Sequence, residues 1–182
     1  MKIGIIIGST REGRNGEAVG KWVEQHAHAK GGSDYELIDL KSFDLPLFTS
    51  QPLPMMAYKQ YDSEAVTAWS RAIDACDGYV FITPEFNHGV PAALKNAVDS
   101  LGSEWSNKSR ALVGYGAVGG VRAVEQWRQI LPNFSQHVVR GAVDLSLFTD
   151  FAEDGVKTSD VKVQGLNGML DELQAAIRRQ GA

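Results

Sequence analysis

Continuous apolar runs alternate along this chain with segments in which apolar residues recur at helical spacing. The runs occupy residues 3–7, 35–40, 79–82, 111–115 and 137–145. Short runs without polar alternation are typical of strands in a parallel sheet whose two faces are both covered. This alternation therefore restricts the chain to a layered arrangement of helices around a buried sheet.

The segments between the runs carry one apolar face each, as Val66, Trp69 and Ile73 illustrate. Further stripes of this kind lie in residues 18–23, 94–101, 124–131 and 166–177. Five strands and five helices in alternating order predict an α/β fold, a flavodoxin-like doubly wound five-stranded parallel sheet with helices on both faces. The six-stranded dinucleotide-binding fold would need a longer chain. We expect a single domain spanning residues 1–182.

Charge and cysteine content narrow the possible partners. Lys and Arg total 18 against 22 Asp and Glu, a net charge of −4, which gives no support to a nucleic-acid or anionic-membrane partner. The apolar run at the N-terminus is too short for a secretion signal or a membrane span. A single cysteine, Cys76, excludes internal disulfides and multi-cysteine metal sites. We therefore expect a cytoplasmic protein without a metal site.

The loop after the first run, residues 8–16, has the composition of a phosphate-binding loop. Ser9 and Thr10 supply hydroxyl donors, and Arg11 and Arg14 supply positive charge. In an open parallel sheet this loop lies at the carboxyl edge, where ligands bind, and the helix that follows adds partial positive charge at its N-terminus. The alternative is a glycine-rich turn with exposed arginines.

Two absent patterns indicate which phosphate this loop would bind. The dinucleotide fingerprint G-x-G-x-x-G is missing. The glycine spacing of the ATP-binding pattern G-x-x-x-x-G-K-[ST] is present, but Arg14 and Asn15 stand where that pattern has lysine and a hydroxyl residue that holds magnesium. The loop therefore suits a metal-free phosphate monoester such as that of FMN. We expect Arg11 to pair with this dianion rather than with the neighbouring Glu12.

Two further loops at the same edge suit a flat ring. Residues 83–91 have a proline near each end and offer Phe86, Asn87 and the backbone of Glu85, which can pack on a heterocycle and hydrogen-bond its edge. Residues 114–120 are rich in glycine, which permits close backbone approach. The alternative for the first of these is a plain strand-to-helix turn. Three such loops at one edge predict a ligand site.

The residues GSTREGRNG after the first run and TPEFNHGVPAALKNAVD after the third resemble the NAD(P)H-dependent FMN reductase family, which includes flavodoxin-like quinone, chromate and azo-dye reductases. The resemblance covers most of the chain, and the second motif is the more specific. It implies bound FMN and electron transfer from NAD(P)H to flavin, a quinone or a similar small acceptor. It also implies subunits paired near the flavin, as a homodimer or homotetramer.

The family resemblance implies cofactor contacts in all three loops. The phosphate contacts would be Ser9, Arg11, Asn15 and Gly16. The ring contacts would be Pro84, Glu85, Phe86 and Asn87, with Gly116 and Gly119 flanking the other edge. Two positions depart from the family pattern: Arg14 stands where many relatives have a small hydroxyl residue, and Phe86 stands where tyrosine is common.

No side chain is predicted to act as a catalytic acid or base, because the cofactors carry hydride transfer while the protein supplies position and electrostatics. The alternative function is a flavodoxin-like electron carrier without its own NAD(P)H oxidase activity. Such carriers usually present a strongly acidic face, which a net charge of −4 does not favour.

Three predictions concern segments outside these loops. Residues 41–61, with three prolines, predict a long irregular loop that is either a lid or contact surface or ordinary surface packing. Residues 148–160 predict a solvated acidic connector without chemistry. The helix at residues 91–101 and the nearby Trp105 predict apolar surface for self-association.

Overall fold

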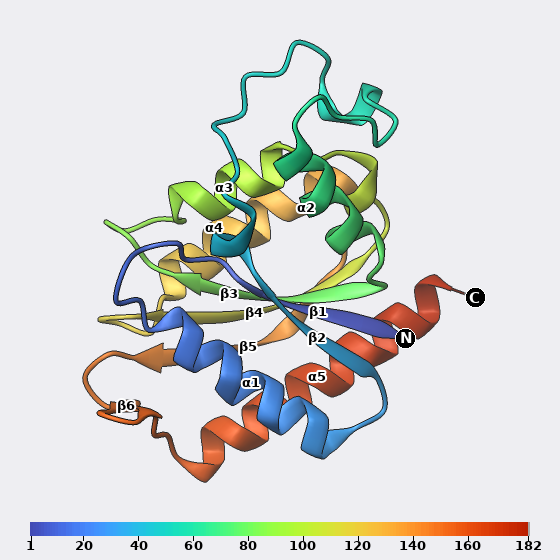
Figure 1. The fold of residues 1–182 in the computed structure, drawn as a ribbon. Coiled ribbons are helices and arrows are strands. Elements are labelled where there is room, and N and C mark those ends of the chain that lie inside the picture. The colour runs from blue at the N-terminus through green and yellow to red at the C-terminus, as the bar shows by residue number, and fades with distance from the viewer. Residues whose placement is uncertain (182) are drawn as a thin grey trace.

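Five parallel strands form the centre of the computed structural model, which describes residues 1–181. In spatial order they are β2 (Asp34–Asp39), β1 (Lys2–Ile7), β3 (Gly78–Pro84), β4 (Ser109–Gly116) and β5 (Val138–Ser146). Figure 1 shows that their carboxyl ends all lie at the same edge of the sheet. This strand order confirms the predicted flavodoxin-like arrangement.

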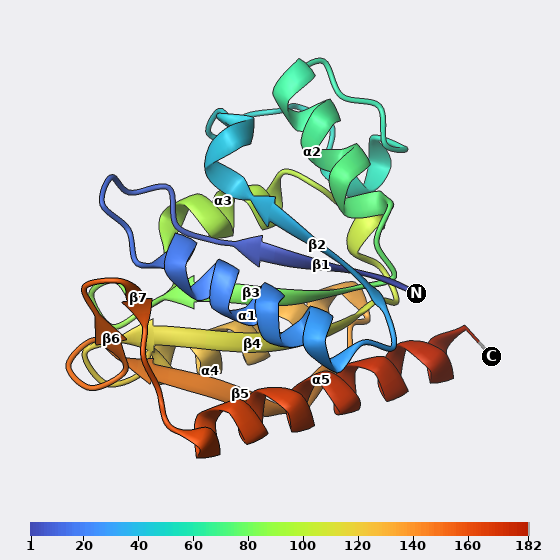
Figure 2. The same ribbon diagram turned by 60° about the horizontal axis from the view of Figure 1, so that its bottom comes forward.

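Helices cover both faces of the sheet, as predicted (Figure 2). One face carries α1 (Gly16–Lys30) and α5 (Asp160–Gln180), and the other carries α2 (Glu64–Asp74), α3 (Ala92–Asp99) and α4 (Val121–Ile130). Successive residues of a strand point to opposite faces of the sheet. Ile5 packs in the core beneath α1 and α5, and Ile6 packs in the core beneath α2, α3 and α4. Both are fully buried, which explains the unbroken apolar runs. Within residues 1–181, no helix combines the length and apolar character needed to cross a bilayer.

Trp105 lies in the core, and the prediction that it offers surface for self-association is wrong. It ends the 3-10 helix η3 (Ser103–Trp105), is 0% exposed, and donates from its indole nitrogen to the carbonyl oxygen of Val98 at 3.0 Å. The guanidinium of Arg110 packs over the indole, 4.2 Å from its ring centroid. Because the short helix turns the ring inward and the apolar stripe of α3 is buried too, residues 91–101 present no such surface.

Residues 44–61 form an irregular segment, here called the strap, which contains one short 3-10 helix, η2 (Pro54–Met56). The long loop predicted at residues 41–61 is thus confirmed from residue 44 on, whereas residues 41–43 belong to the 3-10 helix η1 (Leu40–Phe43). The side chain of Asn96 on α3 fixes one end of the strap. Its Oδ1 accepts a hydrogen bond from the N–H of Phe48, and its Nδ2 donates to the carbonyl of Pro46, both at 2.8 Å.

The far end of the strap is fixed by Tyr61, whose hydroxyl donates to the buried carboxylate of Glu104 at 2.8 Å. Between these two attachments the strap makes further contacts: Lys59 pairs with Asp74 of α2 at 2.7 Å, and the Pro54–Met55 backbone packs against Gly102. Leu45 and Tyr61 pack against the core, but other large apolar side chains of the strap face solvent. The most exposed are Leu47, Leu53, Met56 and Tyr58. The strap thus displays apolar surface, as do the isolated positions Phe148 and Val161, which are 79% and 74% exposed.

Residues 148–160 are more ordered than the predicted acidic connector. They include a short antiparallel pair, β6 (Phe151–Ala152) and β7 (Gly155–Val156). The prediction that this segment is solvated is wrong for Asp150, which is buried at 8% exposure. Its carboxylate accepts from the N–H of Ser146 at 2.8 Å and from the hydroxyl of Thr158 at 3.1 Å. This acidic residue therefore closes the turn after β5 instead of facing water.

Candidate functional site

The carboxyl ends of β1, β3 and β4 lie side by side, so the three predicted loops meet at one edge of the sheet (Figure 1). The winding of the chain reverses between β1 and β3, which is the usual ligand position in open parallel sheets. A hollow opens there, lined by Ser9, Arg11, Arg14, Asn15, Pro84, Glu85, Phe86, Tyr115, Gly116 and Leu147. The fold thus brings together most of the residues predicted from the sequence.

Ser9 gives the clearest sign that this hollow takes a polar ligand. The residue is 1% exposed, and its hydroxyl oxygen has no hydrogen-bond partner within residues 1–181. A buried polar group without a partner costs about 1–3 kcal/mol. A polar ligand group in the hollow would remove that cost.

The start of α1 adds donors beside Ser9. Asn15 is the N-cap residue, and its side chain makes no capping hydrogen bond, so the N–H groups of the first turn lack a side-chain acceptor. Gly16 begins the helix at a crowded point, where a Cβ atom would lie 2.8 Å from the hydroxyl oxygen of Tyr115. Only glycine fits there without movement. Uncapped N–H groups at a helix N-terminus, next to a buried hydroxyl, suit a phosphate group.

The two arginines of the first loop have different surroundings. The side chain of Arg14 is only 7% exposed; Nη1 donates to the carbonyl of Ser9 at 2.6 Å and Nη2 pairs with the carboxylate of Asp39 at 2.5 Å. Arg11 is exposed at the rim of the hollow, and no ion pair among the described residues includes it. The structure thus leaves Arg11 as the free countercharge and gives Arg14 a partner that the sequence did not reveal.

Glu12, the predicted competitor for Arg11, is engaged elsewhere. Its Oε1 lies 2.6 Å from Nζ of Lys41, which follows β2. This hydrogen-bonded lysine lowers the pKa of the Glu12 carboxyl. Glu12 therefore remains charged at neutral pH and does not occupy Arg11.

The loop after β3 is a closed turn with an exposed aromatic ring. The N–H and C=O groups of Phe86 bond those of Gly89 at 3.1 Å each, and the two residues between them, Asn87 and His88, have φ of 48° and 71°. Gln126 on α4 holds the turn from outside, donating to the carbonyl of His88 and accepting from the N–H of the residue after Gly89, both at 3.0 Å. The turn is therefore rigid, and Phe86 is 40% exposed.

Glu85 has fewer backbone groups free for a ligand than the sequence suggested. Its N–H donates to the carbonyl of Tyr115 at 3.0 Å. Its carboxylate caps α4, accepting from the N–H of Arg122 at 3.0 Å and pairing with Nη1 of Arg122 at 2.7 Å. Partial burial opposes ionisation, but the hydrogen bonds from Arg122 lower the pKa of Glu85 overall. Only the Glu85 carbonyl is left for a ligand.

The glycine-rich loop after β4 forms one wall of the hollow through Gly116. The carbonyl of Gly116 accepts from the N–H of Gly119 at 3.1 Å and of Leu147 at 3.0 Å. Gly119 has φ of 79° and lies against Asp144, where a Cβ would come within 2.8 Å of the Asp144 Cβ. Gly119 therefore shapes the loop and does not line the hollow. Leu147, which follows β5, does line it and was not predicted.

Three other predicted residues lie beside the hollow rather than in its lining. Thr10 is exposed and borders a neighbouring depression with Lys41 and Asn96. Asn87 occupies the tip of the turn, and Gly16 is buried where the first loop enters α1.

Tyr115 is a site residue that the sequence analysis missed. It is the residue of β4 next to Gly116, 5% exposed, and it lines the hollow. Burial raises the pKa of its phenol, opposed by the adjacent Ser9 side chain and then by the positive charges of Arg14 and Arg11. Tyr115 therefore stays neutral at physiological pH. It belongs to an apolar strand, so periodicity assigned it to the core.

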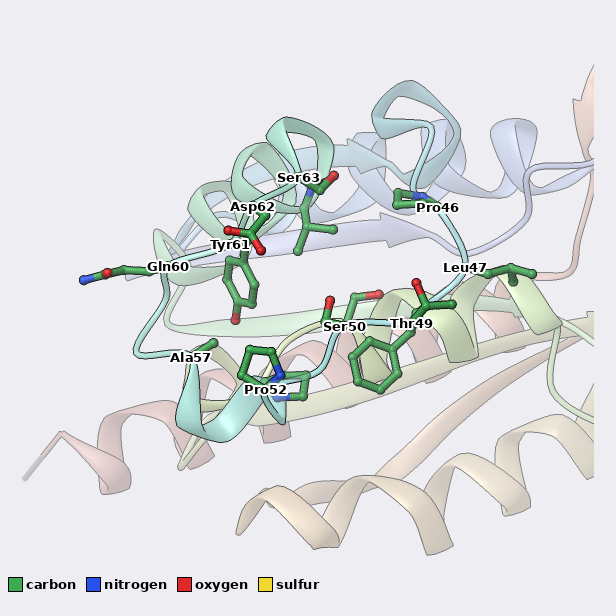
Figure 3. Close-up of a pocket in the computed structure, with 14 residues that line it drawn as sticks. Pro46, Leu47, Thr49, Ser50, Pro52, Ala57, Gln60, Tyr61, Asp62 and Ser63 are labelled. Atoms are coloured by element: carbon green, nitrogen blue, oxygen red, sulfur yellow. Dashed lines mark hydrogen bonds between the residues drawn. The ribbon is translucent and has the colours of Figure 1, made fainter.

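A second cavity, of about 160 Å³, lies under the strap (Figure 3). Its lining includes Phe48, Tyr61, Val66 and Ser100, and Asp62 is its one charged residue. Ser100 follows the last residue of α3, whereas the turn at Phe86 precedes the first, so the cavity lies at the opposite end of that helix. With no basic side chain in its lining, it suits a phosphate less well than the sheet edge does. Within residues 1–181, no three His, Cys, Asp or Glu side chains are grouped to hold a metal ion.

Comparison with known proteins agrees with this geometry. Residues 1–150 match the family model described as NADPH-dependent FMN reductase. An NAD(P)H-dependent FMN reductase of Schizosaccharomyces pombe is 35% identical over 155 residues, 85% of this chain and 78% of its own length. A quinone reductase of Pseudomonas putida is 31% identical over 71% of this chain and 68% of its own.

Solved structures share the fold at lower identity. A flavoenzyme NAD(P)H:(acceptor) oxidoreductase from Paracoccus denitrificans aligns with a TM-score of 0.76 and 21% identity over 98% of both chains. The apo form of an NADH:FMN oxidoreductase aligns with a TM-score of 0.72 and 18% identity, over 96% of this chain and 89% of that one. These likenesses support the architecture described above.

Proposed function

Because the chain belongs to the NADPH-dependent FMN reductase family, we propose that it is an FMN-dependent oxidoreductase that passes electrons from NAD(P)H to flavin, a quinone or a similar small acceptor. The observation that carries this proposal is the meeting of three loops around the unpaired hydroxyl of Ser9. Bound FMN supplies the hydride chemistry. The residues of this chain bind the cofactor, orient it and leave one face open to nicotinamide and acceptor.

The first loop is our proposed phosphate site. Its donors are the hydroxyl of Ser9, the free guanidinium of Arg11 and the N–H groups of the first turn of α1, with Asn15, Gly16 and Thr10 around them. These groups offer a dianion both hydrogen bonds and countercharge.

The second and third loops are our proposed ring site. The exposed Phe86 ring and Pro84 offer apolar contact, while the Asn87 amide and the Glu85 carbonyl offer hydrogen bonds. Gly116 lets the backbone approach the other edge of the ring, and Gly119 gives that loop its path. Since both loops are held by hydrogen bonds to other parts of the fold, the site is formed before the ligand arrives.

The absorption spectrum of the purified protein tests the cofactor assignment. We expect one FMN per chain after reconstitution, and bleaching of the flavin when NADPH or NADH is added without oxygen. Binding of FAD in place of FMN, or of no flavin, would contradict the proposal. Steady NAD(P)H oxidation with a quinone supports the enzyme. Reduction of the flavin only through a separate reductase would indicate the electron carrier.

We also propose that the protein self-associates as a homodimer or homotetramer through the strap. Four of its apolar side chains, Leu47, Leu53, Met56 and Tyr58, are 62–81% exposed, which is costly for an isolated subunit. In light scattering at micromolar concentration, Met56→Lys/Tyr58→Lys should reduce the mass to that of one 19.8 kDa chain. Val161→Lys, at an equally exposed position on α5, is the control and should not. A wild-type monomer would refute this proposal.

Three broader expectations remain as proposals. The protein acts in the cytoplasm, consistent with its single, buried cysteine, Cys76. It has small-molecule acceptors and no nucleic-acid partner, consistent with its net charge of −4. Residues 1–182 act as one domain.

A further inference from the structure

Arg14 is the residue of the phosphate loop whose polar contacts run into the protein. Nη1 reaches the carbonyl of Ser9 and Nη2 reaches the carboxylate of Asp39, at 2.6 and 2.5 Å. The Arg14 side chain is 7% exposed and that of Asp39 is 34% exposed. Arg11, three positions earlier, is exposed instead. The two arginines therefore cannot serve a ligand in the same way.

Asp39 is fixed by contacts of its own. It is the last residue of β2, which pairs with β1 so that Asp39 lies opposite Ile7, immediately before the phosphate loop. Its Oδ1 accepts from the N–H of Lys41 at 3.0 Å, which caps the 3-10 helix after β2. With one oxygen held by this backbone group, the other is aimed at Arg14. The carboxylate thus gives the arginine a stationary partner.

We propose that Arg14 and Asp39 form a positioning pair that fixes the backbone of Ser9 for phosphate binding, and that Arg14 does not contact the phosphate. This inference rests on the proposed FMN site. A guanidinium can bridge two acceptors in a fixed geometry, which an ammonium or a hydroxyl cannot do. By holding the Ser9 carbonyl, Arg14 keeps the neighbouring hydroxyl directed into the hollow. Asp39 balances its charge, so attraction of the dianion falls to Arg11.

Asp39→Asn distinguishes this role from the obvious alternative by the sign of its effect. If Arg14 were a phosphate ligand restrained by Asp39, removing the carboxylate would free a cation and delete a negative charge near the dianion, so FMN would bind more tightly. If the pair positions Ser9, the same change loosens the loop and FMN binds more weakly. Simple electrostatics and the positioning role therefore predict opposite outcomes.

The experiment measures the dissociation constants of FMN and riboflavin by flavin fluorescence. We expect Asp39→Asn to weaken FMN binding about five- to twentyfold, the range of one buried, charge-assisted contact. Riboflavin, which lacks the phosphate, should change less than about twofold, whereas general damage to the fold would weaken both ligands. The matched control is Glu12→Gln, which removes a carboxylate from the exposed Glu12–Lys41 pair between the same two segments. It should change FMN affinity less than about twofold.

A double variant tests whether Arg14 and Asp39 act as a unit. Arg14→Ala should weaken FMN binding to a similar extent, and Arg14→Ala/Asp39→Asn should be no weaker than Arg14→Ala alone. If Asp39→Asn does not fold, Asp39→Glu replaces it: the charge is kept but the reach is changed, so weaker FMN binding is still expected.

Three results would overturn the inference: tighter FMN binding by Asp39→Asn, equal losses for FMN and riboflavin, or additive losses in the double variant. If the wild-type protein binds riboflavin and FMN normally, these results refute the positioning pair and leave the proposed function standing. If the wild-type protein binds no flavin, the proposed function fails and this inference with it.

Discussion

The phosphate loop and the strap are both irregular segments that follow neighbouring strands, β1 and β2, yet the fold holds them in opposite ways. In the loop, contacts run inward: Ser9 is buried, and Arg14 bonds both the loop and the end of β2. In the strap, Asn96 holds two backbone groups and apolar side chains face water. A segment that presents a fixed set of donors is short and tied to the core, whereas one that presents surface is long and attached at few points.

This contrast separates two properties of the protein. Cofactor affinity should depend on the loop and respond little to changes in the strap. Protease resistance should depend on the attachments of the strap and respond little to loss of a charge in the loop. A change confined to one segment therefore tests whether the two properties are independent.

The largest effect is expected from Arg11→Ala. Losing the free countercharge should weaken FMN binding about ten- to a hundredfold, since a charge-assisted contact contributes roughly 1.5–3 kcal/mol. Riboflavin should bind both proteins nearly alike. The matched control is Lys59→Ala, which removes a strap cation paired with Asp74 at 2.7 Å and should leave FMN affinity unchanged. Equal losses for riboflavin and FMN would show that the loop is not the phosphate site.

An intermediate effect is expected from Asn96→Ala, which removes two hydrogen bonds to the strap at 2.8 Å. The free energy of unfolding should fall by about 1–2 kcal/mol, and limited proteolysis within the strap should speed up about tenfold. FMN affinity should stay within about twofold, because the phosphate loop has its own contacts. Asn133→Ala, at an exposed site before β5, is the control. Unchanged proteolysis would mean that packing, not Asn96, holds the strap.

The smallest effect is a pH dependence at the other strap attachment. Burial, with the hydrogen bond to Glu104, raises the pKa of Tyr61 above its ordinary value of 10.0. Because the folded state favours the protonated phenol, the stabilisation is complete below about pH 10 and is lost as the pH rises beyond it. The stability difference between wild type and Tyr61→Phe, measured by urea unfolding, should therefore shrink above pH 10. A difference that stays constant to pH 11 would contradict this attachment.

The sheet could be predicted because a strand that is buried on both faces appears in the sequence as an unbroken run of apolar residues. Phe81 and Ile82, adjacent in β3, face opposite cores and are both 0% exposed. Trp105 could not be placed, because a three-residue 3-10 helix has no period that would assign its face. The loops could be located by composition, since glycines, hydroxyls and prolines cluster after the strands.

The contacts inside the site were harder to foresee. The pairing of Arg14 with Asp39 joins positions 25 residues apart and depends on the register of β1 with β2. Gln126 reaches the turn at His88 from a helix whose sequence stripe indicated only which face was apolar. Tyr115 was hidden because a site residue at the end of a strand looks like a core residue. The sequence therefore predicted which loops meet at the sheet edge, whereas the partners of each side chain there depend on tertiary pairing.

The two attachments of the strap also bear on how such a protein can change over evolutionary time. The chain between Phe48 and Tyr61 is a loop closed at both ends, and the entropy of closing a loop rises slowly, by about 0.6 kcal/mol for each doubling of length. Longer or different sequences are therefore tolerated there, except where the Pro54–Met55 backbone packs against Gly102 and where Lys59 pairs with Asp74. At Gly16, where a Cβ would lie 2.8 Å from Tyr115, even one methyl group is resisted. Length and sequence can therefore vary in most of the strap at a smaller cost in stability than at the start of α1.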